Sequence, residues 1–430
     1  MESHNLMKRL QRWFSGLSPD FRKFWIGQTV SEFGSRITRG GIPLIAVITL
    51  AATPAQMGIL TAVASIPVLL IGLFAGAWVD RLRRRPILIA MDLSRMALLL
   101  TIPAAALTGH LRIQLLYVVI AAAGVLGLIF ETAYHAYLPS LVERDQIVEA
   151  NSRLTTSESL AEIGGPALAG VLIQTISAPL AMIFDSLTFL FSAACAALIR
   201  KPEPAPKPRV AGRSVWHEIA DGVRLVARDP LLRTLALSMA LRSFFGSFFG
   251  TLYDIYGIRV LGLTPSLLGI TIAAGGIGAL IGALLASRLQ KRFGLGKTLI
   301  GALLLSGMIN LLIPLAGGSV ALATALLIIA QIVGDGAMTI YWINSVSLQQ
   351  IIVPDHLLGR TNASFGFLAQ GIAPVGALIA GALATGFGAR ITLLISVLGI
   401  LATAIWVSQS PVRKLEGYTL PERSAEVESI

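Results

Sequence analysis

The chain has 430 residues, of which 55% are apolar and 13% are charged. Soluble proteins usually contain about 25% charged residues, so this composition excludes a water-soluble domain and predicts a protein that lies largely in lipid. The formal net charge of +11 would be compatible with nucleic-acid binding, but the positions of the basic residues have a simpler explanation.

Apolar segments separated by turn signals predict twelve transmembrane helices. Residues 43–79 and 298–334 contain no Asp, Glu, Lys or Arg. A span needs about 20 residues, so each run has the length of two spans joined by a tight turn. The sequence therefore predicts an all-α polytopic membrane protein with two six-helix halves. The predicted spans are residues 23–50, 56–79, 86–108, 113–135, 155–176, 180–200, 231–256, 266–287, 297–316, 320–346, 361–386 and 390–410.

The positions of the Lys and Arg residues predict the orientation of the helices. With a cytoplasmic N-terminus, 27 of the 34 basic residues fall on the cytoplasmic side, four (Arg36, Arg39, Arg95 and Arg242) lie within spans, and only Arg112, Arg259 and Arg390 fall outside. Cytoplasmic loops carry such an excess in membrane proteins, so we expect both termini in the cytoplasm. The positive net charge then follows from topology, and no nucleic-acid partner is expected.

A long charged loop separates the two halves. It begins with a Pro-rich stretch that predicts an extended linker. The residues that follow have one apolar and one charged face, which is typical of an interfacial helix. We expect a cytoplasmic N-terminal segment (1–22), an N-terminal six-helix bundle (23–200), a cytoplasmic linker with an amphipathic helix (201–230), a C-terminal six-helix bundle (231–410) and a cytoplasmic tail (411–430).

The two halves repeat each other weakly. Pro54, in a Thr-Pro turn, recurs as Pro265 with an offset of 211 residues, and a pair after span 4 has an offset of 210. The loop that begins at Asp80 pairs with the one at Ser287, with an offset of 207. Parallel six-helix repeats are typical of transporters that rock around a site between their halves.

The loop between spans 2 and 3 resembles the signature loop of the major facilitator superfamily. It reads Gly-Ala-Trp-Val-Asp-Arg-Leu-Arg-Arg-Arg over residues 76–85. Phe24–Gln28 and Leu138–Val142 narrow the resemblance to the bacterial efflux branch that contains enterobactin exporters and macrolide-efflux proteins. Two features depart from the family: Arg83 stands where a glycine is usual, and span 4 has no arginine.

This resemblance covers roughly residues 20–410 and implies the major facilitator fold. It implies a secondary transporter in the bacterial cytoplasmic membrane that acts as a monomer on a small-molecule substrate, with lipid around it. It also implies a gating role for the signature loop, in which Gly76 packs against span 11 and Asp80, Arg81 and Arg84 latch the inward-closed state.

Two further gating residues come from span 5. Gly165 and Pro166 resemble part of the glycine–proline motif of the exporters, which lets helices pack closely and bend. Ordinary packing of small residues explains the same pattern, so both readings stay open.

Span 1 carries three charged residues, Glu32, Arg36 and Arg39, on one helix face. On insertion scales each charge costs about 2.5–3.5 kcal/mol, so a lipid-facing stripe would cost roughly 8 kcal/mol. This face must therefore line a cavity or contact another helix. Glu32 and Arg36 can form an i,i+4 ion pair, which leaves Arg39 for an anionic substrate group or for Asp335.

Spans 7 and 10 add further candidates. Arg242 is followed by aromatic residues on roughly the same face, which suits an amphipathic or aromatic substrate. Asp335 lies at mid-membrane and is a proton site if it stands alone, or part of a gate if an arginine lies beside it. The sequence leaves both roles open. The other predicted pathway residues are Phe245, Phe249, Tyr253, Gln331 and Trp342.

The leading hypothesis is proton-coupled efflux of a small amphipathic compound, such as a drug-like molecule or a siderophore, by alternating access. A lysolipid flippase and a transporter-derived sensor without turnover are the alternatives. The sequence shows no nucleophile constellation and no metal-ligand spacing of histidines, so we expect no enzyme activity, no cofactor and no metal site. The single cysteine, Cys195, excludes a disulfide within the chain.

Overall fold

The computed structural model describes residues 18–79, 81–203, 226–227, 229–353 and 355–413. Within these ranges the chain forms helices joined by short turns, and no strand is present. The predicted all-α fold is therefore confirmed. Most of the N-terminal segment, of the linker with its predicted amphipathic helix, and of the C-terminal tail lies outside the described residues.

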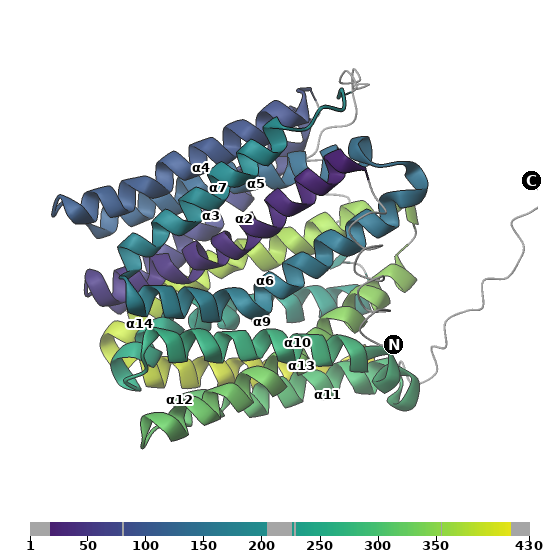
Figure 1. The fold of residues 1–430 in the computed structure, drawn as a ribbon. Coiled ribbons are helices and arrows are strands. Elements are labelled where there is room, and N and C mark those ends of the chain that lie inside the picture. The colour runs from purple at the N-terminus through teal and green to yellow at the C-terminus, as the bar shows by residue number, and fades with distance from the viewer. Residues whose placement is uncertain (1–17, 80, 204–225, 228, 354, 414–430) are drawn as a thin grey trace, which may run out of the picture. The chain divides into compact units, whose positions relative to one another are not determined.

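The described ranges hold twelve long helices once α14 is divided (Figure 1). α14 (Asp355–Ser408) is broken at Gly388, whose φ of 81° and ψ of 159° are not helical, so it comprises two spans. The others are α2 (Pro19–Leu44), α3 (Pro54–Val79), α4 (Arg84–Leu107), α5 (Ile113–Leu141), α6 (Ile147–Thr175), α7 (Ala178–Ala197), α9 (Pro230–Ile255), α10 (Pro265–Phe293), α11 (Leu295–Asn310) with its continuation α12 (Leu312–Leu315), and α13 (Val320–Ile352).

Most of these helices are suited to cross a membrane. Eight helices of the described part are long and apolar enough by length and composition. α2, α3 and α6 are not among the eight: side chains of α3 lie partly outside the described residues, whereas charged and polar residues lower the hydropathy of α2 and α6. The chain is a multi-pass membrane protein, and α2 and α6 need protected surroundings for their charges.

The predicted span boundaries differ most from the helices at the ends expected to face the cytoplasm. α5, α10 and α13 each continue six residues past the predicted ends at residues 135, 287 and 346. α6 begins eight residues before 155, and α14 begins six residues before 361. Hydropathy predicts where the apolar stretch of a span ends. The helix itself continues into the solvent until it reaches residues that do not favour helical structure.

The helices form two compact units. Residues 1–212 with 263–273 make up the first unit, and residues 213–262 with 274–430 make up the second. In the first unit α2 packs against α6 and α7, and α4 packs against α5 and α7 (Figure 1). In the second unit α14 packs along α9, and α11 packs along α13.

The internal repeat is visible in the backbone where the first helix of each half ends. α2 continues into the π-helical turn η1 (Ile45–Thr49), and α9 continues into η3 (Tyr256–Val260), 211 residues later. Ala51 and Gly262 follow at the same offset, with φ of 50° and 69°. α3 and α10 also begin 211 residues apart, so the offset predicted from the Thr-Pro turns holds in the structure.

The repeat in the next loop needs a correction. α4 and α11 begin 211 residues apart, so the predicted offset of 207 between Asp80 and Ser287 is wrong by four residues. The reason is that α10 continues further than α3 before its loop. At the corrected offset Arg83 is equivalent to Gly294. Gly294 has a φ of 81° whereas Arg83 is extended with a φ of −69°, so replacing the glycine gives a different backbone path.

Glycines seven residues apart bring α2 against α7. Gly27, Gly34 and Gly41 share one face, because seven residues complete nearly two helical turns. An added Cβ at each of them would collide with α7, and at Gly27 it would lie 2.9 Å from the Cβ of Cys195. Glu32 lies on the opposite side of α2. The close contact with α7 therefore turns the charged face away from that helix.

Glycines also bring α10 against α13 in the second unit. An added Cβ at Gly278 would collide with the backbone carbonyl of Ile332, and one at Gly282 would collide with that of Gly336. Such contacts between backbones require glycine. The glycine-rich run 275–278 therefore serves helix packing.

Candidate functional site

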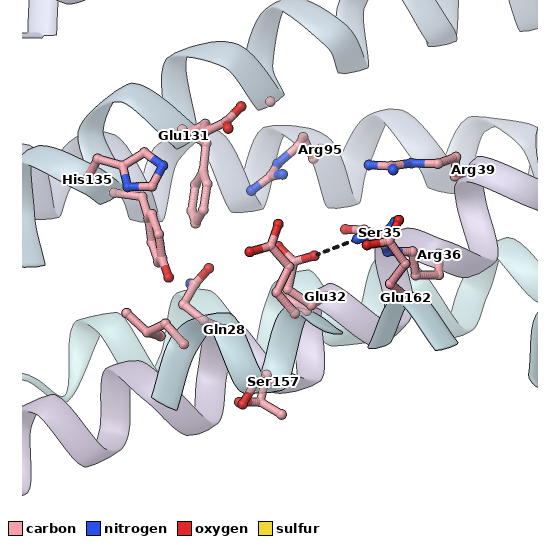
Figure 2. A pocket seen from close by; sticks show the side chains of 17 residues that line it. Gln28, Glu32, Ser35, Arg36, Arg39, Arg95, Glu131, His135, Ser157 and Glu162 are labelled. Atoms are coloured by element: carbon pink, nitrogen blue, oxygen red, sulfur yellow. Dashed lines mark hydrogen bonds and ion pairs between the residues drawn. The ribbon is translucent and has the colours of Figure 1, made fainter. Parts of the chain in front are cut away.

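The first unit contains a cavity of about 390 Å³ with a charged wall (Figure 2). Glu32, Arg36 and Arg39 line it from α2, so the polar face of this helix borders a cavity and does not face lipid. α4, α5 and α6 form the rest of the wall. The charged or titratable residues that they contribute are Arg95 from α4, Glu131, Tyr134 and His135 from α5, and Glu158 and Glu162 from α6.

Arg36 is the buried charge of this wall, with a side chain that is 9% exposed. Its Nη1 lies 3.5 Å from Oε1 of Glu162, and its Nη2 lies 4.0 Å from Oε2 of Glu32. The i,i+4 pair expected from the sequence is present, and α6 adds a second carboxylate. Because a buried cation must be compensated, we assign Arg36 to the attachment of α6 to α2.

Gly165 makes this approach of α6 to α2 possible. An added Cβ at Gly165 would lie 2.5 Å from the Cβ and 2.6 Å from the Cγ of Arg36. The preceding residue, Gly164, has more room, since its added Cβ would meet a ring carbon of Phe33 at 3.4 Å. Pro166 lies inside α6. Of the two predicted gating residues of span 5, Gly165 is thus in contact with the charged face of α2.

Arg39 is exposed and forms no ion pair with any described residue. Glu32, Glu162 and Glu131 act on it electrostatically without direct contact. Figure 2 shows Arg39 at one end of the pocket and Glu131 with His135 at the other. The cavity thus has an uncompensated positive charge at one end, available to an anionic or hydrogen-bond-accepting group.

The opposite end of the cavity is acidic and aromatic. Glu131 and Glu158 are exposed and have no ion pair within the described ranges. The rings of Phe130 and Tyr134 line the same cavity, 6.3 Å apart and nearly parallel, and His135 contacts Tyr134 edge-on at 5.1 Å. Carboxylates beside aromatic faces are suited to hold an organic cation.

Arg95 is a cavity residue that the predicted site does not include. Its guanidinium carbon lies 4.2 Å from the ring centre of Phe130 and 4.3 Å from that of Phe189. Its Nη2 lies 2.5 Å from Oδ1 of Asp92, which is fully buried. The i,i+3 spacing of an acidic and a basic residue inside an apolar helix is the signal that could have identified this pair.

Asp185 of α7 is a second fully buried carboxylate, also absent from the predicted site. It accepts hydrogen bonds from the hydroxyl groups of Thr38 and Thr188, the latter at 3.0 Å. Arg95 and Asp92 both act on it electrostatically. The three ionisable groups of α4 and α7 therefore form one buried group, the Asp92–Arg95–Asp185 cluster.

In the second unit, Arg242 of α9 and Asp335 of α13 interact electrostatically. The guanidinium of Arg242 also lies over the ring of Tyr341, 5.9 Å from its centre. The Tyr341 hydroxyl is 2.6 Å from that of Ser238. Asp335 thus has an arginine near it, the arrangement that the sequence associates with a gate. Gly275 of α10 faces the Asp335 carboxylate closely enough for an added Cβ to collide with Oδ2.

The other candidates of spans 7 and 10 have different surroundings. The Phe245 ring fills the space left by Gly399 of α14, and its carbonyl accepts a hydrogen bond of 2.6 Å from Ser396. Phe245 is therefore in a helix contact within this unit. Of the remaining predicted residues, Phe249, Tyr253 and Gln331 are half-buried and Trp342 is exposed.

The signature loop is described only in part. Asp80 and the surroundings of Gly76 lie outside the described residues, and Arg81 is exposed. Glu203 accepts hydrogen bonds of 2.6 and 3.1 Å from the backbone N–H groups of the first two residues of α4, and it lies 3.8 Å from the guanidinium of Arg84. The start of the linker is thereby attached to the end of this loop, and Arg84 has a carboxylate partner from the linker.

Comparison with known proteins identifies the family of the chain. The chain matches the family described as transmembrane secretion effector over residues 14–427. It is 27% identical over 338 residues to the multidrug efflux pump Tap of Mycolicibacterium fortuitum, covering 77% of this chain and 81% of that protein. It is 23% identical over 401 residues to macrolide efflux protein A of Streptococcus pyogenes, covering 92% and 97%.

Solved transporter structures share the fold. A bacterial homologue of the iron transporter ferroportin, in an inward-facing state, gives a TM-score of 0.73 at 16% identity and covers 91% of this chain and 98% of its own. A bacterial homologue of the human lysosomal transporter Spinster, inward-facing and occupied, gives 0.71 at 15% identity, with coverages of 94% and 100%. At these identities the similarity shows the fold alone. The family match spans nearly the whole chain, and the protein therefore belongs to the transmembrane secretion effector family of major facilitator superfamily transporters.

Proposed function

We propose that the protein is a secondary active exporter of a small amphipathic compound, driven by a proton gradient across the bacterial cytoplasmic membrane. It works by alternating access, as a monomer with both termini in the cytoplasm. The observation that carries the proposal is the cavity of about 390 Å³ with uncompensated charges at both ends. The similarity to a multidrug efflux pump and a macrolide efflux protein supports the direction of transport.

The chemistry of the cavity favours an amphipathic amine as substrate. Glu131 and Glu158 attract a basic nitrogen, and the rings of Phe130 and Tyr134 contact its apolar neighbours. A cation over an aromatic face gains about 0.5–2 kcal/mol, depending on how far water is excluded. Arg39 at the other end binds an acceptor group of the same molecule. The cavity volume falls within the ~300–1,000 Å³ typical of small-molecule sites.

Uptake into inverted membrane vesicles tests this function. Three fluorescent dyes of similar size, one cationic, one neutral and one anionic, are supplied with a proton gradient. We expect uptake of the cationic dye, and we expect an uncoupler to abolish it. Uptake that persists without a gradient would remove the proton coupling, and a preference for the anionic dye would contradict the amine site.

Variants of the acidic end link this uptake to the cavity. Glu131→Gln combined with Glu158→Gln is expected to reduce uptake of the cationic dye and to leave uptake of the neutral dye unchanged. Glu143→Gln is the control, because Glu143 is an exposed carboxylate just after α5. A sensor without turnover would tolerate neutralisation of its membrane charges. Loss of uptake when Glu32, Arg39, Arg242 and Asp335 are neutralised in a folded protein would exclude that alternative.

A further inference from the structure

The Asp92–Arg95–Asp185 cluster lies behind the wall of the cavity. Its two carboxylates are 0% exposed, whereas Arg95 reaches the cavity itself. Ionisable groups are costly within a membrane and are retained where they perform a function. Substrate binding does not require Asp92 or Asp185, because neither lines the cavity.

The charges of the cluster do not balance. Arg95 attracts both Asp92 and Asp185, and Asp92 and Asp185 repel each other. With both carboxylates ionised, the cluster carries one excess negative charge at a site closed to solvent. Two carboxylates that share such a site do not readily ionise together, and they titrate as a pair.

The hydrogen bonds of the cluster leave room for a proton. Oδ1 of Asp92 accepts from Nη2 of Arg95, but Oδ2 is buried without a hydrogen-bond partner among the described residues. The Ser192 hydroxyl, which accepts from Nε2 of Gln28 at 3.0 Å, lies close enough to this carboxylate to act as a donor to it. Oδ2 can take up a proton here, since in the acid form it becomes a donor and the Ser192 oxygen can then accept.

The charged groups on the neighbouring helices lie on the cavity side. Glu32 of α2 acts on Arg95 from there, so three carboxylates compete for one guanidinium. Phe130 and Phe189 hold that guanidinium between their rings. The other charged or titratable groups of these helices line the cavity, and they are Arg36 and Arg39 from α2, Glu131 and His135 from α5, and Glu158 and Glu162 from α6.

We propose that Asp92 and Asp185 share one transported proton, and that Arg95 couples its binding to the charge of the cavity. This rests on the proposed exporter function. When a proton binds, one carboxylate becomes a neutral acid and Arg95 is released toward Glu32, where its charge opposes a cationic substrate. When the proton leaves, both carboxylates hold Arg95 and the cavity becomes more negative. One proton thus enters on the side where the amine is released and leaves on the side where it binds.

Infrared difference spectroscopy of the purified full-length protein in lipid tests this site directly, with a change of pH as the probe. We expect the wild type to show a protonated carboxyl band at neutral pH. Asp92→Asn and Asp185→Asn should each lose it, because the one remaining carboxylate is balanced by Arg95. Asp145→Asn, which alters an exposed carboxylate after α5, and Asp335→Asn should retain the band.

The outcomes separate the proton site from the transport function. A wild type without the band, a band that persists in both Asn variants, or a band lost only in Asp335→Asn would overturn the proposal. A protein that shows the band but takes up no dye would contradict the exporter function and support the proton site. In vesicles, Asp92→Asn and Asp185→Asn should lose gradient-driven uptake and retain dye exchange at equal pH. Unchanged gradient-driven uptake would overturn the coupling.

Discussion

Gly165 of α6 lies against the side-chain stem of Arg36 of α2, so that an added Cβ would come within 2.5 Å of the Arg36 Cβ. Gly165→Ala must therefore separate the two helices or displace Arg36 from Glu162. Overpacking of this kind costs about 1–3 kcal/mol. We expect a lower thermal midpoint in detergent and reduced uptake. Gly164→Ala is the matched control, since its Cβ meets Phe33 at 3.4 Å, and equal losses in both variants would contradict this reading.

The pairing of Arg36 predicts non-additive effects of its two partners. Glu32→Gln or Glu162→Gln alone leaves one carboxylate near the buried guanidinium, whereas the double variant leaves none. Coupling within such a network is about 0.5–3 kcal/mol, so the double variant should be destabilised by more than the sum of the single variants. Thermal midpoints of the four proteins measure this. Glu131→Gln and Glu158→Gln are the control, because neither carboxylate forms an ion pair within the described ranges. Their effects on the thermal midpoint should be additive.

The charged face of α2 could be predicted because it depends on a single helix. The 3.6-residue period places Glu32 and Arg36 together whatever surrounds them, and the cost of charge in lipid requires a protected position. The Asp92–Arg95–Asp185 cluster, in contrast, could not be predicted from one helix, because it depends on which helices pack against each other. Asp92 and Asp185 come together because α4 packs on α7, and the spacing of the residues along the chain does not encode that contact.

The aromatic residues of α9 show the same limit. Their spacing predicts on which face of the helix Phe245 lies, but it does not predict which residue contacts that face. Gly399 of α14 receives the ring, and a glycine more than a hundred residues away gives no sign of this in the sequence.

The internal repeat could also be predicted only in part. Its offset could be read at the Thr-Pro turns and was misread at the charged loop, where similar Arg-rich stretches can be aligned in more than one way.

Gly275 and Asp335 provide a test of the charge pair in the second unit. Gly275→Ala would place a methyl group against Oδ2 of Asp335 and turn the carboxylate away from Arg242. We expect uptake to fall to the level of Asp335→Asn, because both changes remove the same interaction. Gly301→Ala is the control, since an added Cβ there meets nothing within 4 Å. Normal uptake by a folded Gly275→Ala protein would show that the position of this carboxylate is unimportant.

Ala51 and Gly262 hold equivalent left-handed positions, with φ of 50° and 69°. A left-handed alanine costs about 1–2 kcal/mol, and glycine loses about 0.4–1 kcal/mol through the greater freedom of the unfolded chain. Ala51→Gly is therefore expected to raise the thermal midpoint slightly, and Gly262→Ala to lower it. The two variants serve as controls for each other. A shift of the same sign in both would contradict the equivalence of the two turns.

The two ends of α5 test the orientation of the chain. Cys195 is the single cysteine, so Cys195→Ala gives a background for placing new thiols. α5 has 29 residues and a length of about 43 Å, so His110 before it and Asp145 after it lie on opposite sides of a bilayer. A membrane-impermeant maleimide should label His110→Cys in intact spheroplasts, and Asp145→Cys only after permeabilisation. The reverse pattern would invert the predicted topology, whereas uptake into inverted vesicles would still report export, because these vesicles expose the cytoplasmic face of the membrane whichever way the chain crosses it.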